Sequence, residues 1–133
     1  MNLVLSTRVV KGHEDVGIFL GIKNIGRGSA KAPYLAFTIP EPFRLAQFGL
    51  DGNGREGLPK LPRSGQMYRY GANSTFVIHP STVHEVAKLD LGFGLNKPSV
   101  PTGTVIIEYE ITAEDSQIIR SSKSIDLDSV IQE

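Results

Sequence analysis

Residues 52–57, Gly-Asn-Gly-Arg-Glu-Gly, match the G-x-G-x-x-G pattern of a dinucleotide-binding turn. In that turn the glycines follow a strand and open a helix whose N-terminus receives the pyrophosphate. Here the chain continues as Leu-Pro-Lys-Leu-Pro, and two prolines so close together oppose a helix. The pattern therefore predicts an ordinary loop, and we expect no cofactor.

The three histidines are the residues best suited to hold a metal ion. His79 and His84 flank an expected turn, and His13 lies beside Glu14 and Asp15 in another. The ends of neighbouring strands could bring two histidines together, but a zinc site needs three or four ligands and no third ligand is evident. We therefore expect turn histidines at the surface and no metal.

The sequence contains no recognisable set of residues for nucleophilic or acid–base catalysis. No Gly-x-Ser-x-Gly elbow is present, and no histidine has an acid placed to orient it. Glu108 and Glu110 would lie about 7 Å apart on one strand face. They alternate with Tyr109 and Ile111, which is typical of a solvated outer face. The chain is predicted not to be an enzyme, and a small hydrolase or metal enzyme is the last-ranked alternative.

Composition sets further limits on function. The 133 residues suit a single domain, residues 1–133. The absence of cysteine excludes disulfides and thiolate catalysis, and it suits a reducing compartment. The formal net charge is zero, so neither nucleic acid nor an anionic membrane is an expected partner. No apolar run reaches the roughly 18 residues of a membrane span and no export signal is evident, so a cytoplasmic location is predicted.

Short alternating apolar segments predict strands almost throughout the chain and no helix. The expected strands are residues 2–10, 16–25, 34–39, 66–70, 75–79, 85–93, 104–113 and 117–127. The last two form a terminal hairpin. Seven or eight short strands separated by turns favour an all-β sandwich over a closed barrel.

Two strands carry specific expectations about their faces. In residues 16–25 the inward set is Val16, Ile18, Leu20 and Ile22. The outward side of this strand includes Gly17 and Gly21, and glycines in a strand often mark a close backbone neighbour. In residues 85–93 the preferred register buries the apolar residues 87, 89 and 91 and exposes the charged residues 88 and 90.

Two segments carry the likeness to a known family. The first consists of Asn24, Gly26, Ala30, Pro33, Leu35 and Phe37. It resembles the B–C region of bacterial immunoglobulin-like domains of the cell-adhesion-related type. The second, Ile78-His79-Pro80-Ser81 followed by Leu89-Asp90-Leu91, resembles their later strand pair, and the terminal hairpin would supply the F and G strands.

This resemblance implies an immunoglobulin-like Greek-key β-sandwich that serves as an add-on module of a larger bacterial protein. Such domains also occur after Schlafen/AlbA-type ATP-binding modules, and we expect a context of that kind. The Asn and Gly residues at positions 24, 26 and 28 are explained by backbone conformation rather than by chemistry. Asn24 can hydrogen-bond nearby backbone, and Gly26 and Gly28 can adopt positive φ where the chain leaves the strand.

Residues 43–70 interrupt the strand pattern. From residue 43 to residue 65 the chain is rich in Gly and Pro, which predicts a long inserted loop, and long loops tend to be functional. Residues 128–133 are expected to be a tail or a linker. The insertion interleaves aromatic residues with arginines, the residue types that are enriched at protein interfaces. The predicted partner-binding residues are Phe43, Arg44, Phe48, Arg63, Tyr68, Arg69 and Tyr70.

Three interpretations of these residues remain open: they cap one end of the sandwich, bind a protein, or stack sugar rings. The favoured function is a non-enzymatic interaction or regulatory module that contacts a protein partner or a neighbouring domain of the same chain. The alternative is a carbohydrate-binding module. A homodimer through an edge strand is a further expectation, since residues 2–10 contain only Arg8 as an internal charge.

Overall fold

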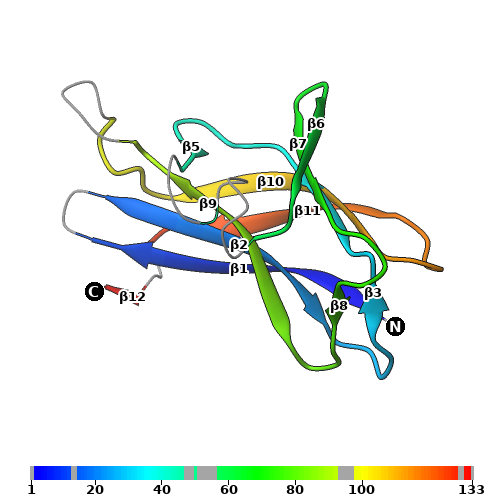
Figure 1. Ribbon diagram of the computed structural model, residues 1–133. Coiled ribbons are helices and arrows are strands. Elements are labelled where there is room, and N and C mark those ends of the chain that lie inside the picture. Colours follow the sequence, from blue (N-terminus) through cyan, green and yellow to red (C-terminus); the bar gives the residue numbers. More distant parts are fainter. Residues whose placement is uncertain are drawn as a thin grey trace.

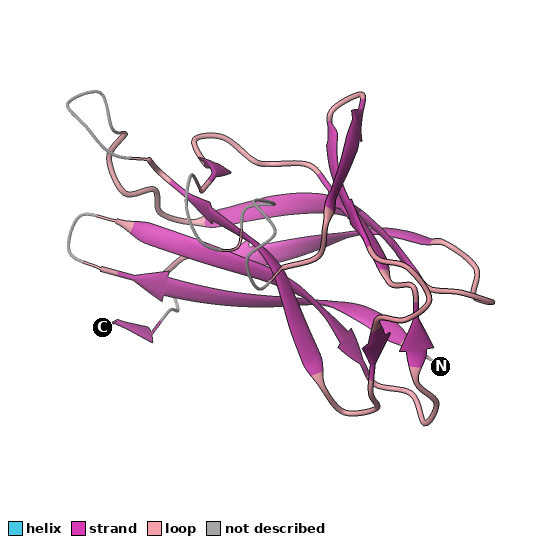
Figure 2. Ribbon diagram, viewed as in Figure 1, coloured by secondary structure: helices cyan, strands magenta, loops and turns pink. Residues whose placement is uncertain are grey.

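Two β-sheets lie face to face in the computed structural model (Figure 1). The structure describes residues 2–12, 15–46, 50, 57–92, 98–128 and 131–132. These residues form no helix, and hence none that is long and apolar enough to cross a membrane (Figure 2). Eight of the described strands have four or more residues, which confirms the prediction of an all-β sandwich.

The first sheet has five strands. Their spatial order is β12 (Ile131–Gln132), β1 (Leu3–Lys11), β2 (Val16–Asn24), β9 (Val83–Asp90) and β5 (Arg44–Leu45). All neighbours are antiparallel except β1 and β12, which pair in parallel. Part of the expected tail at residues 128–133 therefore belongs to the sheet.

The second sheet also has five strands, and all its pairs are antiparallel. Their spatial order is β11 (Ile119–Asp126), β10 (Thr104–Thr112), β4 (Tyr34–Phe37), β7 (Met67–Gly71) and β6 (Lys60–Ser64). The terminal hairpin β10–β11 is as predicted. A small ladder of β3 (Ala30–Lys31) and β8 (Val77–Ile78) lies at one end of the sandwich (Figure 1).

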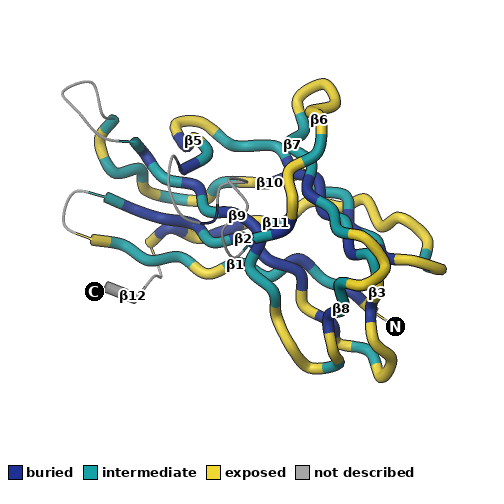
Figure 3. Tube along the Cα trace, viewed as in Figure 1, coloured by how far each residue is buried: buried dark blue, intermediate teal, exposed yellow. Residues whose placement is uncertain are grey.

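The core lies between the inner faces of the two sheets (Figure 3). Its largest fully buried side chains are Tyr70, Phe37, Ile18, Leu20, Ile22, Leu35, Leu58, Ile78, Leu89, Leu91, Ile107 and Ile111. The inward set predicted for residues 16–25 is confirmed, because all four of its members are at most 1% exposed. The preferred register of residues 85–93 is confirmed too, with residues 87, 89 and 91 fully buried.

A β-bulge in β9 explains one of the outward glycines. Leu20 pairs with Ala87 but Gly21 pairs with Glu85, so Val86 is the extra residue. A Cβ atom on Gly21 would lie 2.7 Å from the carbonyl oxygen of His84, closer than real Cβ contacts. The expectation of a close backbone neighbour is therefore confirmed at Gly21.

The segment at residues 43–70 contains more sheet than the sequence predicts. The weak strand expected at residues 66–70 is confirmed as β7, which lies inside the second sheet between β4 and β6. The loop expected at residues 60–64 is wrong, because these residues form β6. β6 is an edge strand with four of its five residues exposed, so it shows no apolar alternation, and its Pro62 is tolerated only at an edge. Residues 46, 50 and 57–59 lie outside the strands, which agrees with a loop there.

Asn24 is the one buried polar residue of the described chain. Its Nδ2 donates to the carbonyl oxygens of Gly28 and Ile78 at 2.7 and 3.0 Å, and its Oδ1 accepts from the N–H of Gly26 at 3.0 Å. The predicted bonding of Asn24 to nearby backbone is confirmed. The expected positive φ at Gly26 and Gly28 is wrong, and Ala32 adopts it instead at 49°.

Replacing Asn24 with Ala should destabilise the domain by about 2–4 kcal/mol, because buried polar groups of the backbone lose their partners. Urea unfolding followed by circular dichroism measures this loss. Asn73→Ala is the matched control, since Asn73 bonds the N–H of Thr75 at the surface, and it should cost under about 1 kcal/mol. Equal losses in the two variants would contradict the structural role of Asn24.

The bulge also turns His84 toward the inner face, because His84 pairs with the core residue Ile22. Its ring meets the Phe76 ring edge-on at 4.8 Å, and its Nε2 atom has no hydrogen-bond partner within the described ranges. Burial lowers the pKa of His84, and the neighbouring Glu85 carboxylate opposes this shift in the pKa. The expectation of a surface turn histidine is therefore wrong for His84.

A lowered pKa in the folded state makes the contribution of His84 to stability depend on pH. This contribution should be complete above the unfolded pKa, about 6.5, and should fall as the pH drops toward the folded value. Urea midpoints measured from about pH 7.5 to about 5.5 should therefore decrease, and more steeply in the wild type than in His84→Leu. Parallel pH profiles for the two proteins would contradict the assignment.

Candidate functional site

A hollow of about 250 Å³ lies between the edge of the first sheet at β5 and the β6–β7 hairpin of the second sheet. It is lined by Thr38, Ile39, Phe43, Arg44, Leu45, Arg63, Gln66 and Tyr68. Four of these were predicted as partner-binding residues, although they are separated by up to 25 positions in the chain. The hairpin projects beyond the body of the sandwich (Figure 1). Its contribution to the hollow comes from residues at and near its turn, Arg63, Gln66 and Tyr68.

Residues 38–43 bring the two sides of the hollow together. The chain leaves β4 in the second sheet and reaches β5 in the first, with Phe43 donating its N–H to the carbonyl oxygen of Pro40 at 2.9 Å. The Phe43 side chain is 7% exposed and belongs to the core cluster. It therefore forms part of the apolar floor of the hollow rather than a protruding contact.

Tyr68 is the half-buried aromatic residue of the hollow. Its ring stacks on Phe37 with 6.4 Å between the centroids, and Phe37 in turn stacks on Tyr70 at 5.7 Å. The guanidinium carbon of Arg63 lies 4.4 Å from the Tyr68 centroid and the Lys60 ammonium lies 5.6 Å away. Two cations are thus held over a ring that is anchored to the core.

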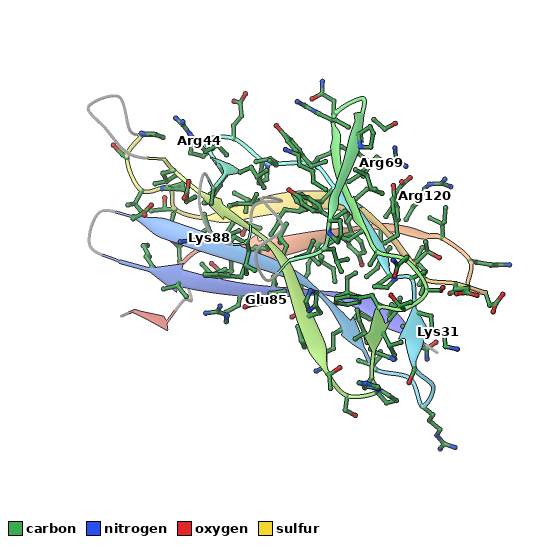
Figure 4. The ribbon with its side chains drawn as sticks, in the orientation of Figure 1. Lys31, Arg44, Arg69, Glu85, Lys88 and Arg120 are labelled. Atoms are coloured by element: carbon green, nitrogen blue, oxygen red, sulfur yellow. The ribbon has the colours of Figure 1, made fainter. Side chains whose placement is uncertain are left out.

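Arg44 forms the opposite wall of the hollow (Figure 4). It is exposed on β5, opposite Asp90 of β9, and its guanidinium packs over Gly92. A Cβ atom on Gly92 would lie 2.7 Å from the guanidinium carbon, and Gly92 has a φ of +77°. Glycine at this position therefore allows Arg44 to lie flat against the backbone.

Positive charge is concentrated around this hollow. Residues 57–71 contain Lys60, Arg63 and Arg69 and no acidic residue, although the whole chain is neutral. Among the residues that the structure describes, none with a carboxylate lines the hollow. Neither Arg44 nor Arg63 forms an ion pair with any residue that the structure describes. Their charges are therefore available to an acidic ligand.

The other predicted residues have different places. Tyr70 is fully buried, so its predicted role in partner binding is wrong; it alternates with Arg69 on β7 and faces the core. Arg69 lies on the outer face, where its Nε donates to the Tyr34 hydroxyl and its Nη1 to the Pro62 carbonyl, both at 3.1 Å. Arg69 braces the hairpin rather than lining the hollow. Phe48 lies outside the described residues.

Sequence reasoning missed part of the lining of the hollow. Thr38, Ile39, Leu45 and Gln66 were not predicted, because none has a residue type that signals binding. Only their position in the sequence near Phe43 and Tyr68, at the ends of strands, could have indicated that they line a binding surface. The wall contributed by β5 was also not foreseeable from a two-residue strand.

A second hollow, of about 310 Å³, lies on the outer face of the first sheet. Its floor is Phe19, which has the Arg8 guanidinium 3.9 Å and the Lys88 ammonium 5.4 Å from its centroid. Arg8 donates to both carboxylate oxygens of Glu85, at 3.0 and 3.1 Å, and Asp15 lines the same hollow. Its charges are compensated within the chain, unlike those around Arg44 and Arg63.

The residues considered for metal binding, nucleotide binding and acid–base catalysis do not form a site within the described ranges. No three His, Asp or Glu residues are grouped there as a metal site. The G-x-G-x-x-G segment lies outside these ranges except for Gly57, where a Cβ atom would lie 2.3 Å from the Val86 carbonyl oxygen. Glu108 is exposed on the outer face, and Glu110 accepts from Arg120 at 2.6 Å, as expected for a solvated face.

Comparisons with known proteins support the fold. No family model matches the chain, and no curated protein matches it. Among solved structures, the chain is similar to a cohesin module from a family 33 glycoside hydrolase of Clostridium perfringens ATCC13124. The TM-score is 0.54 and the identity 12%, over 99% of this chain and 97% of that module. This likeness shows the β-sandwich fold.

The two tyrosines of β7 should respond differently to truncation. Tyr70→Ala removes a fully buried ring and should cost about 3–5 kcal/mol of unfolding free energy. Tyr68→Ala removes a half-buried ring at the hollow and should cost about 1 kcal/mol. Urea unfolding of both variants tests this difference. Similar losses would mean that Tyr68 is a core residue and not part of a binding surface.

Proposed function

We propose that this chain is a non-enzymatic interaction module that binds an acidic segment of a partner protein, or of a neighbouring domain, in the hollow between β5 and the β6–β7 hairpin. The observation that supports the proposal is the segregation of charge. Arg44 and Arg63 line one hollow, and no carboxylate of a described residue lines it, in a chain whose net charge is zero. Complementary charge would steer an acidic partner to this corner and orient it there.

The construction of the hollow also favours binding of an extended peptide. Arg63 is held against the Tyr68 ring and Arg44 against Gly92, so less side-chain freedom is lost when a ligand binds. Phe43, Ile39 and Leu45 offer apolar floor for one side chain of the ligand. Acidic groups flanking an apolar residue would match this arrangement.

The place of the domain in a larger protein is part of the proposal. The similar cohesin module is itself a module of a glycoside hydrolase, and the sequence resembles add-on domains of bacterial proteins. An ATP-binding module of the Schlafen/AlbA type remains our suggestion for the neighbour. The acidic segment would then lie either on that neighbour or on a separate protein.

A carbohydrate ligand is the less favoured alternative. Sugar rings stack on open aromatic faces, but the Tyr68 ring already contacts Phe37 and the Arg63 guanidinium. A sugar would have to displace Arg63. Binding to a glycan array that is lost in Tyr68→Ala would favour this alternative.

Fluorescence anisotropy with a short labelled peptide of glutamate and leucine tests the proposal. Arg44→Ala and Arg63→Ala should each weaken binding about tenfold, equivalent to about 1.4 kcal/mol. Arg27→Ala is the matched control, because Arg27 is an exposed arginine in the turn before β3, and it should bind as the wild type does. Equal binding of a peptide with glutamine in place of glutamate would overturn the role of charge.

A further inference from the structure

Each sheet of the sandwich ends in two edge strands, and exposed edges pair with other chains unless they are blocked. Three of the four edges carry a blocking feature. β5 has only two residues, and β6 contains Pro62 and a shift of register against β7. β1 is covered at Val10 and Lys11 by β12.

The edge of β1 has a second block. Lys123 of β11 reaches across the sandwich and donates to the Leu5 carbonyl oxygen at 3.1 Å. Burial lowers the pKa of Lys123, which agrees with its partly desolvated position between the sheets. This bond occupies an acceptor that a strand added to β1 would need. The expectation that β1 could serve as a dimer edge is therefore weakened.

β11 is not shortened, broken or covered by another described strand, and its inward-pointing charge, Lys123, is bonded to Leu5 of the same copy. Its eight residues pair with β10 without a shift of register, and it contains neither proline nor glycine. Leu127 donates to the Gly103 carbonyl oxygen at 2.8 Å, so odd-numbered residues of this ladder bond toward β10. The N–H and C=O groups of Arg120, Ser122 and Ser124 therefore point to the open edge, where no described strand pairs with them.

We propose that β11 is a homodimer interface, in which the β11 strands of two copies pair antiparallel and join their second sheets. Pairing across a twofold axis requires a strand that is self-complementary when it runs antiparallel to its own copy. An axis through Ser122 satisfies this requirement, because Arg120 then faces Ser124 of the second copy and small serines meet at the axis.

The same register also fits the apolar residues and the charges. Ile119, which is 42% exposed, would lie opposite Ile125 of the second copy. The two Arg120 side chains would be about 13 Å apart along the strand, beyond the screening length of about 8 Å at physiological salt. Lys123 would face Ser121 of the second copy, which leaves the two Lys123 residues about 7 Å apart along the strand. Each Lys123 ammonium is directed to the Leu5 carbonyl oxygen of its own copy, away from the other.

This interface is independent of the proposed peptide site. β11 and β6 are the opposite edge strands of one sheet, in the order β11, β10, β4, β7 and β6 (Figure 1). A dimer through β11 would therefore leave both hollows open at the far ends of a continuous sheet. Loss of dimerisation and loss of peptide binding are separable outcomes.

Single-cysteine cross-linking tests the register, because the chain has no cysteine of its own. In Ser122→Cys the two thiols would lie on facing residues about 5.5 Å apart between Cα atoms, within disulfide range. Mild oxidation should give a covalent dimer on a non-reducing gel. Ser64→Cys places an exposed thiol on the blocked edge strand β6 and should remain monomeric. Equal cross-linking of both variants would overturn the proposal.

Light scattering of the untagged protein over a concentration series tests the dimer itself. The wild type should approach twice the monomer mass, and Ser122→Pro and Ser122→Lys should remain monomers. Proline at residue 122 removes an N–H that points away from β10, so no bond of the existing ladder is lost, and lysine tests the same position without a change in the backbone. A wild type that stays monomeric throughout, or dimers that persist in both folded variants, would overturn the proposal.

Discussion

The buried amide of Asn24 is the interaction on which the arrangement of the first sheet depends. Its three hydrogen bonds join the end of β2, the following turn and β8, and its backbone also bonds Ser81 and Thr82. A buried amide without partners would be costly, so these segments must meet in one way. This junction fixes where β9 begins, and therefore where its bulge lies against Gly21.

The position of β9 in turn places the candidate site. Among the described strands β5 pairs with β9 alone, at Leu89 and Asp90, so Arg44 takes its position from that strand. The opposite wall comes from the second sheet, where Tyr70 and Phe37 anchor the Tyr68 ring to the core. The hollow is thus a product of sheet packing, and its cations are held by strands rather than by a free loop.

Alternation of apolar and polar residues predicted most of the fold because most strands have one buried and one solvated face. β2 and β10 follow this pattern and were predicted almost to the residue. β6 could not be found in this way, since an exposed edge strand has no buried face to mark it. The prediction of positive φ at Gly26 and Gly28 was wrong because the conformation of this turn depends on a tertiary arrangement. The buried side chain of Asn24 stabilises the turn, so the glycines need no positive φ.

The candidate site was predictable in its residue types but not in its assembly. Clustering of arginine and aromatic residues indicated a surface, and Arg44, Arg63 and Tyr68 do line one hollow. Composition cannot separate Tyr68 from Tyr70, because both lie on the inner side of β7 and differ only in how far along the strand the opposing sheet covers them. The distribution of charge, in contrast, can be determined from the sequence alone. Residues 57–71 contain three cationic residues and no acidic residue, although the whole chain is neutral. The acidic residues that balance this segment therefore lie elsewhere in the sequence. That imbalance is the physical reason to seek the partner among acidic segments.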